Sequence, residues 1–176
     1  DKEAAYGSLD FHYPLPPQYT QTYDYGGHLG LDLHAPEGTD IYSVDDGYVE
    51  LAGGADNYKK PDDPTGKPTG EQRGYFVVVR NDTNDPYNGN SLITRYLHMY
   101  QNPDVTAGET VSKGETLGGV GKTGKYEGPE AVDHLHIDFN SSNIINTGMT
   151  PSAYIRSQYF WPDVNFTPKP NRDALN

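Results

Sequence analysis

The stretch DHLHIDF, from Asp133 to Phe139, places two histidines one residue apart. Its apolar residues recur at every second position, which is typical of a half-buried β-strand whose side chains alternate between two faces. On such a strand one face packs on a core, and the other carries His134, His136 and Asp138. Two imidazoles on one face can bind a metal ion or move protons. The alternative is a strand with an ordinary polar outer face.

A second segment, GGHLGLD, holds His28 and Asp32 four residues apart. Its glycines argue against a helix, and on a straight strand the two side chains would lie roughly 13 Å apart, too far to share an ion. Gly30 permits a bend that would bring them together. The alternative is a pair of exposed polar residues beside a glycine turn.

A third segment, TRYLHMY, places His98 on a predicted strand. Counting by twos puts His98 on the same face as Tyr96 and Tyr100, with Leu97 and Met99 on the other. A strand with one polar face would explain this pattern without any chemistry.

Together, the three segments indicate a metal site. Two histidines and one carboxylate form a tetrahedral zinc site whose fourth position is open to water, as in catalytic zinc centres. Further histidines would then handle the proton of that water. The chain contains no cysteine, so any metal must have nitrogen and oxygen ligands. It also lacks an HExxH motif, so no helical glutamate base of that kind is present.

The elements that must position these residues are predicted to be short strands. The chain has 20 glycines and 14 prolines among 176 residues and is only 34% hydrophobic, a composition rich in turns. We predict strands at 75–80 and 91–100, a hairpin within 33–51 that turns at Asp46–Gly47, and very short strands between the glycines of 106–124. A helix is plausible only at Pro151–Ser157.

Charge excludes several function classes. The net charge is −12 and the 13 lysines and arginines form no run, which argues against binding to nucleic acids or anionic membranes. No segment approaches the roughly 20 apolar residues of a membrane-spanning helix. The chain starts at Asp1 without a leader, so we expect a mature form or an excised fragment whose export signal has been removed.

Other candidate motifs carry no predicted function. GGVGKTG, at 118–124, lacks the glycine that a phosphate-binding loop requires five positions before Gly121, where Thr116 stands instead. His12 and His34 have no partner pattern, and we expect both at the surface.

HLGLD, YLHM and DHLHIDF, in this order, resemble the three signatures of the lysostaphin/LytM-type zinc endopeptidases, which cut peptide bridges in bacterial peptidoglycan. The segments DLHAPEGTDIYSVDDGYVELAGG, VTAGETVSKGETLGGVGKTG and GMTPSAYI also resemble that family, so the similarity runs from about Gly26 to Ile155. It implies a mainly β fold: a compact antiparallel, β-barrel-like core (a duplicated hybrid motif) with an open groove and few or short helices.

The resemblance also implies a domain organisation. A Tyr- and Pro-rich N-terminal arm at 1–25 would precede a zinc metallopeptidase domain at 26–157. That domain would carry a long loop insertion at 53–74, which leaves the shape of the groove open. An irregular C-terminal tail at 158–176 would follow.

By the same resemblance, His28, Asp32 and His136 would bind one Zn²⁺, and His98 and His134 would be catalytic histidines that do not bind it. The resemblance leaves open which of these two is the base and which stabilises the oxyanion. Two weaker candidates accompany them. Tyr23 or Tyr25 would add a hydroxyl donor, and Asp138 would either fix an imidazole tautomer or be a solvated carboxylate.

The implied function is a zinc-dependent endopeptidase that hydrolyses peptide cross-links or stem peptides of peptidoglycan through a zinc-activated water. We expect it to act as a monomer outside the cell or at the cell envelope, either secreted or anchored through a segment absent here. The bond could lie in a glycine-rich bridge or a D-amino-acid cross-link. Two alternatives are a non-catalytic module that binds peptidoglycan or a partner protein, and a small-molecule zinc hydrolase on an unrelated β fold.

Overall fold

The protein is mainly β, as predicted. The computed structural model describes residues 5–23, 30–54, 73–124, 132–142, 154–155 and 164–170. The strands in these ranges are β1 (Asp10–His12), β2 (Thr22–Tyr23), β3 (Leu31–His34), β4 (Asp40–Tyr42), β5 (Gly47–Gly53), β6 (Tyr75–Asn81), β7 (Leu92–Met99), β8 (Thr110–Val111), β9 (Thr116–Gly119), β10 (His134–Ser141), β11 (Tyr154–Ile155) and β12 (Asn165–Thr167). No helix among the described residues has the length and apolar character needed to cross a membrane.

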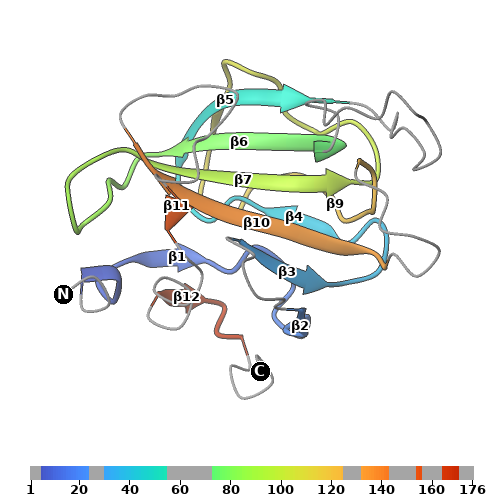
Figure 1. Ribbon diagram of the computed structural model, residues 1–176, viewed down its shortest axis with the longest axis horizontal. Helices are drawn as coiled ribbons and strands as arrows, with labels where there is room; N and C mark the ends of the chain where they lie inside the picture. The colour runs from blue at the N-terminus through green and yellow to red at the C-terminus, as the bar shows by residue number, and fades with distance from the viewer. Residues whose placement is uncertain are drawn as a thin grey trace, which may run out of the picture.

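Eight strands form the main sheet, in the order β2-β3-β10-β7-β6-β5-β8, with β11 paired to β10. Every pairing in this sheet is antiparallel. Figure 1 shows β5, β6, β7 and β10 side by side across the molecule. Two small sheets, β4-β9 and β1-β12, accompany it. The antiparallel core is therefore confirmed, but the main sheet is open, with β2 and β8 at opposite ends of the order of described strands.

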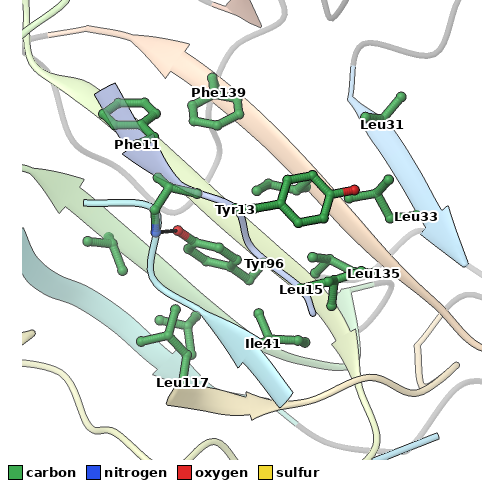
Figure 2. Packing of buried hydrophobic residues seen from close by; sticks show 14 of the residues in the cluster. Phe11, Tyr13, Leu15, Leu31, Leu33, Ile41, Tyr96, Leu117, Leu135 and Phe139 are labelled. Atoms are coloured by element: carbon green, nitrogen blue, oxygen red, sulfur yellow. Dashed lines mark hydrogen bonds between the residues drawn. The ribbon is translucent and has the colours of Figure 1, made fainter. Parts of the chain in front are cut away.

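One face of the sheet packs on the main hydrophobic core. β10 contributes Leu135, Ile137 and Phe139 to this core, so the alternation predicted for DHLHIDF is confirmed. Figure 2 shows Leu135 and Phe139 in the same cluster as the buried Tyr96, whose hydroxyl accepts a hydrogen bond from the amide of Val44 at 2.9 Å. The bond gives the polar end of a fully buried tyrosine a partner.

The N-terminal segment supplies a large share of this core. Five of its side chains are at most 2% exposed: Tyr6, Leu9, Phe11, Tyr13 and Leu15. Phe11 of β1 stacks on Phe139 of β10, with ring centroids 6.2 Å apart. Burying a side chain of this size typically contributes about 1.5–3 kcal/mol. The described part of the predicted arm is thus integral to the packing.

The opposite face of the sheet carries a smaller apolar cluster. Phe76 and Val78 of β6 pack there with Ile93 and Leu97 of β7. Because side chains alternate along each strand, the polar residues of β10 point to this same face. The sheet therefore separates a large apolar core from a face that is polar along β3 and β10 and apolar along β6.

Two predicted strands are confirmed as β6 and β7, and the short strands within 106–124 as β8 and β9. The predicted hairpin is wrong, because β4 pairs with β9 whereas β5 pairs with β6 and β8. Gly47 serves close strand packing instead, since a Cβ there would lie 2.6 Å from the carbonyl oxygen of Arg80.

The predicted helix at 151–157 is also wrong where the structure describes it. Tyr154 and Ile155 form β11 and pair with Asn140 and Phe139 of β10. Ile155 is buried in the main core, so sheet pairing and burial override the local helix signal. Most of the predicted 53–74 loop, residues 55–72, lies outside the described residues.

Candidate functional site

Two of the predicted metal ligands meet across neighbouring strands. The antiparallel register of β3 and β10 places Asp32 directly opposite His136. Oδ1 of Asp32 lies 3.1 Å from Nδ1 of His136 and 3.9 Å from Nε2 of His134. Residues that face each other in such a pair have closely spaced Cβ atoms, so the register brings the carboxylate to the imidazole of His136.

The ring of His136 is held from its other side by Asp138. Nε2 of His136 lies 2.8 Å from Oδ2 of Asp138, whose side chain is 2% exposed. Arg95 donates from Nε to Oδ1 of Asp138 at 2.9 Å and from Nη2 to Oδ2 at 2.7 Å. Of the two alternatives for Asp138, the solvated carboxylate is therefore wrong.

Arg95 was not found by sequence reasoning. On a strand it shares a face with the apolar Ile93 and Leu97, which was a signal that its charge needs a partner on that face. That partner follows only from the register of β7 and β10, which pairs Arg95 with Asp138. Strand register of this kind cannot be read from a single sequence.

A β-bulge directs His98 to the site. Tyr75 pairs with Met99 and Val77 with Tyr96, so two residues of β7, Leu97 and His98, lie opposite one residue of β6. His98 has a φ of 65°, in the left-handed region. Bulges increase local twist and re-aim side chains beside functional sites.

The face predicted for His98 is therefore wrong. Strict alternation would have placed it with Tyr96, which is buried in the main core together with Met99. Instead, its ring lies beside those of His134 and His136, with centroid separations of 5.3 and 5.9 Å. The extra residue of the bulge lets His98 leave the core side while Met99 returns to it.

Thr123 anchors the histidine in this position. Nδ1 of His98 lies 2.8 Å from the carbonyl oxygen of Thr123. The Thr123 hydroxyl donates to the carbonyl of Met99 and accepts from the amide of Tyr75 at 3.1 Å. The glycine-rich segment 118–124 thus supports a site histidine. A left-handed conformation costs a residue with a side chain roughly 1–2 kcal/mol, and such strain clusters at functional sites.

Hydrogen bonds to backbone carbonyls define the tautomers of His98 and His134. Nδ1 of His134 lies 2.8 Å from the carbonyl oxygen of Val132, and Nδ1 of His98 faces that of Thr123. A carbonyl oxygen only accepts, so each Nδ1 must donate a proton. In their neutral forms both rings therefore keep an unprotonated Nε2.

Burial and neighbouring rings control the charge of His98. Burial, followed by the proximity of His136 and His134, lowers the pKa of His98 to about 3. Burial and the nearby His134 also lower the pKa of His34. His98 is thus a neutral imidazole at neutral pH in the metal-free protein.

The opposite holds for His136. Burial alone would lower the pKa of His136, but hydrogen bonds to Asp138 and Asp32 outweigh it and raise this pKa to about 9. Burial would raise the pKa of Asp138, but its bonds to His136 and Arg95 outweigh that effect and lower it. The carboxylates therefore make this part of the site attractive to a cation.

The chemistry of the site fits a zinc ion. A carboxylate oxygen and an imidazole nitrogen, both typical zinc ligands, converge between Asp32 and His136. The third predicted ligand, His28, lies outside the described residues, as does Tyr25, and the side chain of Tyr23 is not described either. Within the described ranges, no group of three candidate ligands gathers at one point.

Gly30 contributes space at this site. A Cβ on Gly30 would lie 2.8 Å from Cε1 and Nε2 of His136 and from the carbonyl oxygen of Ile137, closer than real contacts allow. The sequence suggested that this glycine permits a bend between His28 and Asp32. The structure adds a steric reason for this glycine, because the imidazole of His136 lies where a side chain would be. The predicted bend involves His28, which lies outside the described residues.

The two histidines expected at the surface are both partly buried. His34 lies opposite His134 in the register of β3 and β10, on the face of the site. His12 is remote from this group: its Nδ1 lies 2.7 Å from the carbonyl of Tyr13, and its ring packs edge-on against Tyr42 at 5.2 Å. His34 is thus an unpredicted neighbour of the site, and His12 is a structural residue.

Comparison with known proteins places this geometry in context. The profile described as Peptidase family M23 matches residues 26–147. The chain is 35% identical over 112 residues to peptidoglycan DD-endopeptidase ShyC of Vibrio cholerae, covering 64% of this chain and 20% of that protein. It is 32% identical over 111 residues to peptidoglycan DD-endopeptidase ShyA of the same organism, covering 63% and 20%. The chain therefore spans about a fifth of the length of these relatives.

Among solved structures, the protein resembles the catalytic domain of the antimicrobial peptidase lysostaphin from Staphylococcus simulans. The TM-score is 0.53 at 18% sequence identity, and the superposition covers 89% of this chain and 95% of that domain. At this level of identity the similarity establishes a shared fold.

Proposed function

The chain belongs to peptidase family M23, and we propose that it is a zinc-dependent endopeptidase that hydrolyses peptide cross-links or stem peptides of bacterial peptidoglycan. The observation that carries this proposal is the approach of Asp32 Oδ1 to His136 Nδ1 at 3.1 Å, with His134 beside Asp32 and His98 beside His136. The names of the two Vibrio relatives support peptidoglycan as the substrate. We also propose that the protein acts at the cell envelope or outside the cell, where this substrate lies.

In this proposal His28, Asp32 and His136 hold the zinc ion. A zinc ion with two imidazoles and one carboxylate supplies Lewis-acid catalysis, because it polarises the carbonyl of the scissile peptide bond. The protein side chains then have to manage two protons. The attacking water must lose one, and the leaving amine must gain one.

His98 and His134 are the residues that manage these protons. Each ring donates from Nδ1 to a backbone carbonyl and therefore presents an unprotonated Nε2. An unprotonated Nε2 can accept a proton from the attacking water, and the imidazolium formed can return it to the leaving amine. The low pKa of His98 makes its ring a weak base in the metal-free protein. The carbonyls of Thr123 and Val132 stabilise that imidazolium and keep both rings oriented.

The test is digestion of purified peptidoglycan, with the released fragments identified by mass spectrometry, in the presence and absence of a chelator. We expect fragments from the wild type that disappear with the chelator and in His136→Ala. His12→Ala is the matched control, because His12 is partly buried but remote from the site, and it should release wild-type fragments. If a zinc-loaded wild type leaves peptidoglycan intact, the proposal is wrong.

A further inference from the structure

We propose that Arg95 and Asp138 are positioning residues that determine which ring nitrogen of His136 binds the metal. This inference rests on the proposed zinc site and adds to it a role for two residues that do not touch the ion. The residues form one continuous chain of contacts, from Arg95 through Asp138 and His136 to Asp32.

The first step is the bidentate contact of Arg95 with Asp138. The guanidinium donates to both carboxylate oxygens, at 2.9 and 2.7 Å, and the two side chains are only 14% and 2% exposed. Such a two-point contact fixes the plane of the carboxylate as well as its position. Oδ2 of Asp138 is thereby directed at His136.

The second step is the choice of nitrogen. Oδ2 of Asp138 lies 2.8 Å from Nε2 of His136, and a carboxylate accepts a hydrogen bond, so Nε2 carries a proton. Nδ1 is then the nitrogen that faces Asp32, at 3.1 Å. A ring turned by half would lose the bond to Asp138. Outer carboxylates commonly orient metal-binding histidines in this way.

The third step separates positioning from stability. Arg95 lies in β7 between Ile93 and Leu97, two residues of the smaller apolar cluster that point to the same face. A buried ion pair in such surroundings is often no more stabilising than apolar residues of similar volume. A gain in stability therefore does little to explain why this ion pair is present. The hydrogen bond from His136 to Asp138 explains it, because the pair orients the imidazole.

The test is the double variant Arg95→Met/Asp138→Leu, which replaces the pair with apolar side chains of similar size. We expect it to fold with little change in stability, yet to bind zinc about 10–100-fold more weakly than the wild type in a competition titration with a chelator. Nitrogen-15 spectra of the zinc-loaded histidine rings should show Nδ1 coordination of His136 in the wild type and a share of Nε2 coordination in the variant.

Two further variants complete the design. Arg80→Met is the matched control, because Arg80 pairs with Glu50 at 3.0 Å on the neighbouring strand and its side chain is 44% exposed, so zinc affinity should not change. Arg95→Lys keeps the charge but loses the two-point grip, and it should weaken zinc binding several-fold even if the double variant fails to fold.

Wild-type affinity with pure Nδ1 coordination in both Arg95 variants would overturn the inference while leaving the proposed function intact. A wild type that binds no zinc would overturn both.

Discussion

The left-handed backbone at His98 predicts an unusual order of stability for two substitutions. At φ 65°, a residue with a Cβ is strained and glycine is not. His98→Gly and His98→Ala both remove the imidazole and its bond to Thr123. The difference between the two variants therefore isolates the backbone strain at this one position.

The magnitude follows from two opposing terms. Releasing the left-handed strain favours glycine by roughly 1–2 kcal/mol. Glycine loses more conformational freedom on folding, which disfavours it by roughly 0.5–1 kcal/mol relative to alanine. We therefore expect His98→Gly to be more stable than His98→Ala by about 0.5–1 kcal/mol. Both should retain the fold but lose at least about 10²-fold in rate, as for other groups that stabilise the transition state.

The assay is urea unfolding of the two variants, both metal-free. The free energy of unfolding of each variant is extrapolated to zero urea, and the two values are compared. An internal control is available at Arg80, an exposed position of β6 outside the left-handed region. There Arg80→Ala should be more stable than Arg80→Gly, so the order reverses. If alanine is also the more stable residue at position 98, the backbone there is unstrained and the account of the bulge is wrong.

Three further substitutions test the site and the core. Gly30→Ala should displace the ring of His136 and weaken zinc binding in a folded protein, because a Cβ would lie 2.8 Å from Nε2 of His136. An unchanged zinc affinity would argue against this contact. Thr123→Val should lower the free energy of unfolding by about 1–3 kcal/mol and slow turnover, because it leaves the amide of Tyr75 without its acceptor. A variant as stable and active as the wild type would contradict this role of Thr123. Phe11→Ala should cost about 3–5 kcal/mol in the same unfolding assay, and a loss below about 1 kcal/mol would show that the N-terminal segment is peripheral.

The sequence predicted those parts of the fold that depend on local alternation. The apolar and histidine faces of β10 follow from a period of two, which burial of one face enforces. The resemblance to the peptidase family supplied the antiparallel β core, which the structure confirms. The assignment of His28, Asp32 and His136 as zinc ligands remains a prediction, to which the contact of Asp32 with His136 gives physical support.

The missed features depend on contacts between distant segments. The bulge at His98 is created by the pairing of β7 with β6, and no residue within TRYLHMY indicates it. Likewise, Asp46–Gly47 has the composition of a hairpin turn, but the strands on either side of it do not pair with each other: β4 pairs with β9, and β5 pairs with β6. Arg95 acquires its role only through the register that sets it opposite Asp138.

The central claim is that one zinc ion, bound at His28, Asp32 and His136, enables this protein to cleave peptidoglycan peptides. The most direct measurement is a titration of the metal-depleted protein with zinc, in which the release of peptidoglycan fragments is followed at each addition. The account predicts no release at the start, a linear rise and a plateau at one equivalent of zinc per chain. Full activity in the metal-depleted protein, or no activity after one equivalent has been bound, would contradict it.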